Sequence, residues 1–290
     1  MEIRTIAVLG AGTMGRGIAH VAAAGGYATK LFDTQEQALR QALETVHRNL
    51  DKGVALGKIE EAAASRAKDN LAIESQLEAC VADADLVIEA VPEIMKLKIS
   101  TFERAAAAAP AEALFASNTS ALSITEMAAA TGRPDRFAGM HFFNPVHIMR
   151  LIELVRGLET SDETLEVMRE VADRMGKEVV LVKESPGFVT SRINALIGNE
   201  AFRMLEAGIA SAEDIDTALK LGLNHPMGPF EMVDLVGLDI RLSILDFLHQ
   251  ELGESYRPSR LLREYVEAGR HGRKVGRGVY EYDSTGKRVG

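Results

Sequence analysis

The chain has 290 residues, 47% of them hydrophobic, so it is long enough to bury a substantial core and to form two domains. Its formal net charge of −9 argues against the broad positive field that attracts polyanions, and we expect no nucleic acid partner. The single cysteine, Cys80, excludes an intramolecular disulfide, and neither a membrane span nor a secretion signal is visible, so we expect an unprocessed cytoplasmic protein without a metal or membrane contact.

Short apolar runs alternate with longer segments of helical periodicity over the first 183 residues. This alternation predicts an α/β domain in which helices cover a parallel sheet. The predicted strands are residues 3–9, 28–32, 86–91, 114–116, 137–140, 151–155 and 179–182. Between the second and third strands, residues 35–70 are rich in Ala, Glu and Lys and are interrupted near Gly53 and Gly57, which predicts a projecting helical hairpin.

The sequence changes character at ESPGFVTSR, residues 184–192, and helical periodicity then continues to about residue 269. A first helix is expected to end at Gly208, and Ser211 with Asp214 is typical of the start of the next one. Only GVYEY, residues 278–282, is a strand candidate. We therefore predict an α/β domain over residues 1–183 and an all-helical domain over residues 184–290. The apolar residues expected on one face of the first helix are Val189, Ile193, Leu196, Ile197, Met204 and Leu205.

Three glycines near the amino terminus, Gly10, Gly12 and Gly15, form the pattern G-x-G-x-x-G between a predicted strand and a predicted helix. Asp33 follows at the end of the next predicted strand, 18 residues after Gly15. This context is typical of a Rossmann-like dinucleotide site, in which backbone amides bind the pyrophosphate and the acid binds the ribose hydroxyls. Because a carboxylate repels a 2′-phosphate, NAD is favoured over NADP. The alternative is that the glycines serve only packing and that Asp33 is an ordinary acid at a strand end.

A dinucleotide site implies hydride transfer, which is helped by a base that takes the proton of an alcohol. His141 is the best candidate because it lies near the carboxyl end of a predicted strand, where ligands of such sheets bind. Glu153, twelve residues on, lies in the next strand-like run and is placed to orient the imidazole. The alternative is that His141 is a structural histidine. Four others, His20, His47, His249 and His271, are expected to be packing or surface residues.

The segment ASNTSALSIT, residues 116–125, places hydroxyl and amide groups directly after a predicted strand. Such a segment is typical of a helix cap, and one of its hydroxyls is also available to a substrate.

These motifs, together with LVIEAVPE, GMHFFNPVHIMRLIELV, ESPGFV and GRGVYEYD, closely resemble the short-chain L-3-hydroxyacyl-CoA dehydrogenases over nearly the whole chain. The resemblance implies that His141 is the general acid/base with Glu153 as its partner, and that Ser120 and Asn144 position the substrate. It also implies that NAD is held by Gly10, Gly12, Thr13, Met14, Gly15, Asp33, Glu93, Lys98 and Lys274.

For the acyl-CoA substrate, the resemblance implies that Lys52 and Lys58 of the helical hairpin help to hold coenzyme A, although both equally fit solvated helix-face charges. Ser191 departs from the family pattern, because many members carry Asn at this substrate-contacting position, and it leaves the acyl-chain preference open. Because the apolar faces of the helical domain exceed the needs of its small core, we expect a homodimer through that domain. Two alternatives are an NAD-dependent dehydrogenase of a sugar acid or carnitine, and a non-catalytic NAD-sensing protein.

Overall fold

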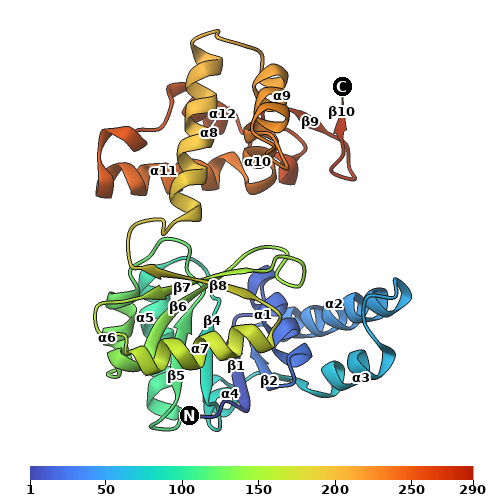
Figure 1. Ribbon diagram of the computed structural model, residues 1–290, viewed down its shortest axis with the longest axis vertical. Helices are drawn as coiled ribbons and strands as arrows, with labels where there is room; N and C mark the ends of the chain where they lie inside the picture. Colours follow the sequence, from blue (N-terminus) through green and yellow to red (C-terminus); the bar gives the residue numbers. More distant parts are fainter. Residues whose placement is uncertain (290) are drawn as a thin grey trace. The chain divides into compact units, whose positions relative to one another are not determined.

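In the computed structural model, which describes residues 1–289, the apolar runs of the first part of the chain form one eight-stranded sheet with the order β3-β2-β1-β4-β5-β6-β7-β8 (Figure 1). All seven predicted strands are present, with ends shifted by up to two residues. The strands are β1 Thr5–Leu9, β2 Ala28–Phe32, β3 Leu71–Glu74, β4 Leu86–Glu89, β5 Leu114–Ser117, β6 Phe137–Phe142, β7 Leu151–Arg156 and β8 Glu178–Lys183.

Strand β3 is absent from the predicted set because it has only four residues and alternates weakly at the edge of the sheet. The sheet is mostly parallel, as expected from the sequence, with one exception. Strands β6 and β7 pair antiparallel, while every other pair in this sheet is parallel. Residues 143–150, which join β6 to β7, are too few for a parallel crossover, which needs about a dozen residues or more.

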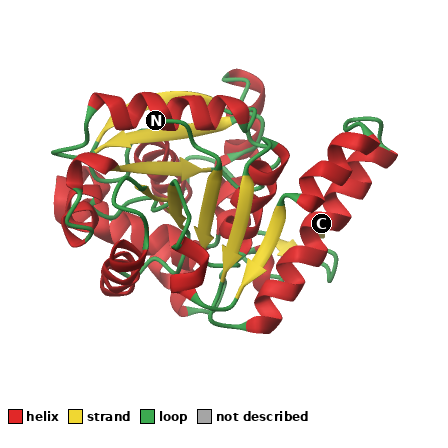
Figure 2. Cartoon of the chain, turned by 90° about the horizontal axis from the view of Figure 1, so that it is seen from below, coloured by secondary structure: helices red, strands yellow, loops and turns green. Residues whose placement is uncertain are grey.

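Helices cover both faces of the sheet (Figure 2). One buried cluster joins the sheet to α1 Thr13–Ala24, α2 Glu36–Ala55, α3 Glu61–Asp69 and α7 Asp162–Arg174. A second buried cluster joins the other face to α4 Leu77–Val81, α5 Met95–Ala108 and α6 Ile124–Ala130. The predicted helical hairpin is confirmed as α2 and α3, with Gly57 at a φ of +65° in the turn between them. Gly53, by contrast, lies within α2.

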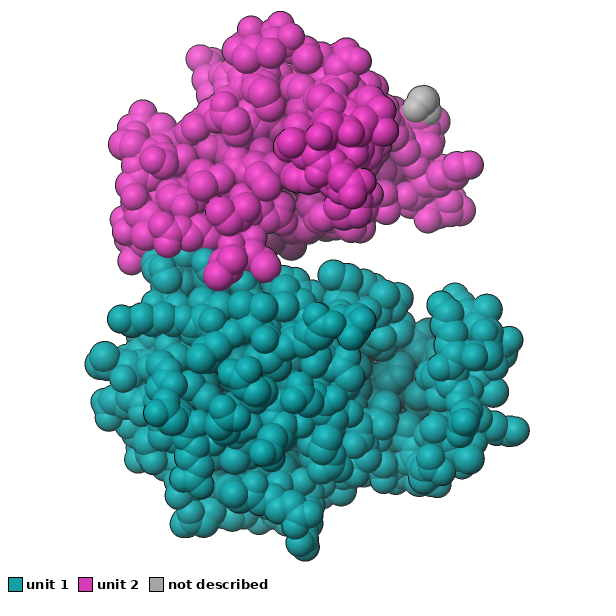
Figure 3. All heavy atoms as spheres, viewed as in Figure 1, with its two compact units in different colours: residues 1–188 teal, residues 189–290 magenta. Residues whose placement is uncertain are grey.

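The chain divides into two compact units, Met1–Phe188 and Val189–Gly290, which we call unit 1 and unit 2 (Figure 3). The division falls five residues after the boundary expected from the sequence. Unit 1 contains the whole eight-stranded sheet. A short 3-10 helix, η1 Pro134–Arg136, leads directly into β6.

Unit 2 is helical, as predicted, with its hydrophobic core between five helices. Ser211 accepts a hydrogen bond from the amide of Asp214 at 3.1 Å and so caps α9, which confirms the predicted helix start. The helices are α8 Thr190–Glu206, α9 Ala212–Gly222, α10 Pro229–Val236, α11 Leu238–Leu252 and α12 Arg260–Glu267, with η2 Glu254–Tyr256, η3 Arg273–Val275 and the strands β9 Glu281–Tyr282 and β10 Arg288–Val289.

The apolar residues expected on one face of α8 do not all pack in the core of unit 2. Val189 and Ile193 are about half exposed, whereas Ala195, Ala201 and Phe202 are buried in the core of unit 2. Apolar residues occur around much of this helix, so spacing alone does not identify the side that packs.

The GVYEY segment is held by two buried carboxylates. Tyr280 donates its hydroxyl to Asp216 and Tyr282 donates to Asp234, each at 2.8 Å. Burial raises the pKa of both carboxyl groups, and backbone amides that donate to them oppose this rise. The motif therefore has a structural role within unit 2. Among residues 1–289, no helix combines the length and the apolar character that crossing a membrane requires.

Candidate active site

The glycine-rich turn follows β1, at the edge of the sheet where the carboxyl ends of β1, β2, β4, β5 and β6 meet. Gly10 has a φ of +107°, and a Cβ at this residue would lie 2.7 Å from the carbonyl oxygen of Ala90. A Cβ at Gly15 would lie 1.7 Å from the carbonyl oxygen of Gly10. These two glycines are therefore required by the turn itself.

Gly12 differs, because a Cβ at this position would meet no atom within 4 Å. It is the N-cap residue of α1, where no side chain caps the helix and no acid occupies the first turn. The adjacent residue, Thr13, is exposed, and Met14 is half-buried. The amino end of α1 thus presents backbone amides and the positive end of the helix dipole to open space, an arrangement that fits the pyrophosphate of a dinucleotide.

Asp33 lies directly after β2 and contacts the same turn. Its Oδ2 accepts a hydrogen bond from the amide of Ala11 at 2.8 Å, and its Oδ1 accepts one from the amide of Gln35 at 2.9 Å. A carboxylate has about four acceptor positions, so a half-buried Asp33 retains capacity for ribose hydroxyls while it fixes the turn. This geometry fits the predicted cofactor contact.

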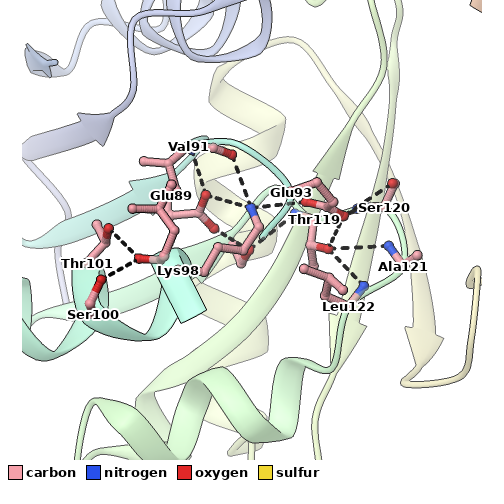
Figure 4. Close-up of polar contacts among 12 residues, drawn as sticks. Glu89, Val91, Glu93, Lys98, Ser100, Thr101, Thr119, Ser120, Ala121 and Leu122 are labelled. Atoms are coloured by element: carbon pink, nitrogen blue, oxygen red, sulfur yellow. Dashed lines mark hydrogen bonds and ion pairs between the residues drawn. The ribbon is translucent and has the colours of Figure 1, made fainter. Parts of the chain in front are cut away.

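A buried ion-pair chain lies beyond the end of β4 (Figure 4). Glu89 is fully buried and accepts hydrogen bonds from the ammonium of Lys98 and from Ser117, at 2.7 and 2.6 Å. Lys98 also pairs with Glu93 at 3.1 Å. The Lys98 side chain is only 1% exposed and is enclosed by these groups, whereas the Glu93 side chain is 42% exposed, so of the two only Glu93 is open to a ligand.

Glu93 connects this chain to the segment after β5. Its Oε1 accepts hydrogen bonds from the hydroxyl of Thr119 at 2.5 Å and from the amide of Ser120 at 3.0 Å (Figure 4). Ser123, not Ser120, caps α6, since it accepts from the amide of Glu126 at 3.2 Å. The half-buried Ser120 hydroxyl, whose contact with Glu93 is long at 3.4 Å, is therefore available for a ligand.

His141 and Glu153 face each other across the antiparallel pair of β6 and β7. They are direct partners in the strand register, so their side chains leave the same face of the sheet. Nδ1 of His141 lies 2.8 Å from Oε2 of Glu153, and both residues are buried. A carboxylate only accepts hydrogen bonds, so the proton of a neutral imidazole resides on Nδ1 and Nε2 carries the lone pair.

Two phenyl rings pack beside the imidazole of His141. The ring centroid of Phe143 lies 4.5 Å away and that of Phe188 lies 5.8 Å away. Phe188 is buried and has a φ of +48°, which is rare for a bulky residue. On the neighbouring strand, Asn118 accepts a hydrogen bond from the amide of Phe142 at 2.9 Å, which ties the end of β5 to β6 beside the histidine.

The remaining predicted site residues lie at the surface, except for Ser191. Asn144 is exposed in the loop that follows β6, Lys52 is exposed in the last turn of α2, and Lys58 is exposed between α2 and α3. Two others belong to unit 2. Ser191 is half-buried in the first turn of α8, and Lys274 pairs with Asp239 at 2.6 Å.

Sequence reasoning missed Glu89 and Phe188. Glu89 has a recognisable signal, because it is an acid at the end of an otherwise apolar strand, LVIE. Phe188 has none, since its contact with His141 depends on a left-handed backbone between Pro186 and α8. No group of three or more His, Cys, Asp or Glu within residues 1–289 is arranged to hold a metal ion.

Comparisons with known proteins match both units. Residues 5–185 match the family described as 3-hydroxyacyl-CoA dehydrogenase, NAD binding domain, and residues 187–282 match 3-hydroxyacyl-CoA dehydrogenase, C-terminal domain. A relative from Bacillus subtilis named "Probable 3-hydroxybutyryl-CoA dehydrogenase" is 44% identical over 98% of this chain and 99% of its own length. The 3-hydroxybutyryl-CoA dehydrogenase of Bradyrhizobium diazoefficiens is also 44% identical, over 97% and 96%. The crystal structure of (S)-3-hydroxybutyryl-CoA dehydrogenase PaaH1 from Ralstonia eutropha has a TM-score of 0.94 and 43% identity, covering 98% of this chain and 100% of that one.

Proposed function

Because the chain belongs to the 3-hydroxyacyl-CoA dehydrogenase family, we propose that it interconverts L-3-hydroxyacyl-CoA and 3-ketoacyl-CoA with NAD as its cofactor. The names of the relatives at 44% identity favour a short acyl chain, that of 3-hydroxybutyryl-CoA. The observation that carries the proposal is the buried pair of His141 and Glu153. This pair places an acid/base group at the same edge of the sheet as the glycine-rich turn.

His141 is the general acid/base of the reaction. Nε2 takes the proton of the C3 hydroxyl during oxidation and returns it to the carbonyl oxygen during reduction. Glu153 fixes the imidazole through Nδ1 and stabilises the imidazolium, because a carboxylate at 2.8 Å in a buried site attracts the cation strongly. When bound, the nicotinamide cofactor would supply the redox chemistry at C3, as a hydride acceptor in the form of NAD and as a hydride donor in the form of NADH.

Ser120 and Asn144 position the substrate. The Ser120 hydroxyl donates to the C3 oxygen, and the Asn144 amide orients the thioester, so that C3 approaches the cofactor in a reactive geometry. Glu93 supports this arrangement, since it holds the Ser120 amide at 3.0 Å.

The cofactor is held by the glycine-rich turn and by Asp33. The amides at the start of α1, from Gly12 through Gly15, bind the pyrophosphate, and Asp33 binds the adenosine ribose. Glu93 and, through it, Lys98 border the cofactor site. In unit 2, Lys274 contributes a further contact to the cofactor.

Coenzyme A binding and homodimer formation involve residues away from the edge of the sheet that carries the glycine-rich turn. Lys52 and Lys58 bind phosphate groups of coenzyme A, and Ser191 contacts the acyl portion of the substrate. Unit 2 forms a homodimer, which accounts for its exposed apolar residues Leu221 and Leu223. The protein functions in the cytoplasm, in keeping with its single buried cysteine.

The test is the loss of NADH absorbance when the purified protein is mixed with acetoacetyl-CoA. Parallel reactions contain NADPH in place of NADH, and free acetoacetate in place of the thioester. We expect rapid oxidation of NADH with the thioester and little reaction in either control. No turnover despite tight NADH binding, or equal turnover of free acetoacetate, would contradict the proposed substrate class.

A further inference from the structure

The loop of residues 143–150, which we call the Asn144 loop, joins β6 to β7 and begins two residues after His141. Within it, the carbonyl oxygen of Pro145 accepts hydrogen bonds from the amides of Ile148 and Met149, both at 2.9 Å. The loop therefore contains a single tight turn. Because Asn144 is exposed at the start of this turn, its position depends on what holds the turn in place.

Lys177 is buried beneath this loop. It lies in the turn between α7 and β8 and is only 7% exposed. Its ammonium donates hydrogen bonds to the carbonyl oxygens of Val146 and Met149, the latter at 2.8 Å. Lys177 thus joins two carbonyl groups of one turn, as a lysine at the carboxyl end of a helix does.

The environment of Lys177 shows that these carbonyls are its main partners. It forms no ion pair within residues 1–289, and the charged or titratable groups that face it are His20 of α1 and His147 of the loop. Burial lowers the pKa of Lys177, and no carboxylate opposes that effect. Burying an ammonium without a counter-ion costs free energy, and the hydrogen bonds to the two carbonyl oxygens offset part of that cost.

Helix α1 also contacts the loop. Val146 is buried, and a Cβ at Gly17 would lie 2.8 Å from the Cβ of Val146, so the loop sits where only a glycine leaves room. His147 stacks on His20 with ring centroids 5.3 Å apart and planes 13° apart. The Asn144 loop is therefore held both by Lys177 and by the helix whose amino end carries the glycine-rich turn.

We propose that Lys177 is a positioning residue for catalysis: by joining the carbonyls of Val146 and Met149, it holds Asn144 in the place from which it orients the substrate. This inference rests on the proposed function, because Asn144 has a substrate to orient only if the chain acts on an acyl-CoA. Lys177 touches neither the substrate nor the cofactor in this account. Replacing Lys177 should therefore lower the turnover of acyl-CoA and leave the affinity for NADH unchanged.

The decisive variant is Lys177→Met, which keeps the length of the side chain and removes its donors. We expect kcat/KM for acetoacetyl-CoA to fall about 10- to 100-fold, because small displacements of positioning groups have effects of this size. The dissociation constant for NADH should stay within about twofold of the wild-type value. Lys177→Arg keeps the donors and should restore most of the activity. Glu178→Gln is the matched control, because it breaks only the exposed pair with Arg150 at the end of the same loop.

Hydrogen exchange provides a readout that does not depend on activity. In Lys177→Met, peptides covering residues 143–150 should exchange faster, while Glu178→Gln should match the wild type. Turnover within twofold of the wild type, or a parallel loss of NADH affinity, overturns the inference. If Lys177→Met does not fold, Lys177→Gln is the second variant, because its shorter, uncharged side chain removes the ammonium that donates to Val146 and Met149. It should raise the same exchange rate, and an unchanged rate overturns the inference. If the wild type itself lacks activity with acetoacetyl-CoA, the proposed function fails, and the exchange data still decide whether Lys177 holds the loop.

Discussion

Acid should destabilise unit 1 through His20, which α1 buries against the Asn144 loop. Burial, followed by the nearby charges of His147 and Lys177, lowers the pKa of His20 from 6.5 to about 4. The unfolded chain therefore binds the proton first as the pH falls below 6.5. The stability that depends on a neutral His20 is lost between pH 6.5 and about pH 4.

The size of the effect follows from these two values. At about 1.4 kcal/mol for each pKa unit, the difference between 6.5 and about 4 corresponds to about 3 kcal/mol below both values. Roughly 2 kcal/mol of this is lost between pH 7 and pH 5. Since marginal stabilities are about 5–15 kcal/mol, a loss of this size is measurable.

The assay is urea unfolding followed by circular dichroism at pH 7 and pH 5, for the wild type and for His20→Gln. The variant cannot take up this proton, so its free energy of unfolding should fall by about 2 kcal/mol less than that of the wild type. His249→Gln, which removes a histidine from the exposed pair with Glu254 in unit 2, should behave like the wild type. An equal acid-induced loss in His20→Gln and in the wild type would refute the reasoning.

Three further variants test two glycines of the turn after β1 and one buried arginine. Gly12→Ala should fold normally, because its Cβ meets no atom within 4 Å, but NADH titration should show at least about tenfold weaker binding. Gly15→Ala should weaken NADH binding and also lower Tm, because its Cβ would overlap the carbonyl of Gly10. Equal NADH affinity in Gly12→Ala would mean that the amino end of α1 is not the phosphate site. Arg241 is 2% exposed, and its Nε has no hydrogen-bond partner. Arg241→Met should therefore raise the free energy of unfolding, measured by urea titration, by about 1–3 kcal/mol. A loss of stability would show that the guanidinium has a partner.

The fold was largely predictable because its strands and helices have strong periodicity. The seven strong apolar runs became strands, and the Ala- and Glu-rich stretch became the α2–α3 hairpin. Strand β3 escaped prediction because four residues at a sheet edge carry too little alternation to distinguish them from a loop. The side of α8 that packs could not be read from the spacing of its apolar residues, because the neighbouring helices determine which residues are buried.

The site was predictable where sequence position fixes geometry. The short connection after β6 makes β7 antiparallel, and this register places Glu153 opposite His141, twelve residues apart in the chain. The spacing raised this pairing as an expectation, but the register that produces it is visible only in the structure. The burial of Lys98 and Lys177, by contrast, could not be predicted from the sequence. Lysine is usually an exposed residue, and nothing in the neighbouring sequence indicates that either side chain is buried. Lys98 finds its partners at and after the end of β4, and Lys177 finds its partners in the loop between β6 and β7.

The most direct test of the account compares kcat for acetoacetyl-CoA reduction in the wild type and in His141→Gln, with NADH affinity and Tm measured on the same preparations. If His141 transfers the proton, kcat should fall by about 10²- to 10⁴-fold while NADH binding and Tm change little. Glu153→Gln should show a smaller loss, because the imidazole remains but loses the carboxylate that stabilises its charged form. Full turnover by His141→Gln would contradict the account.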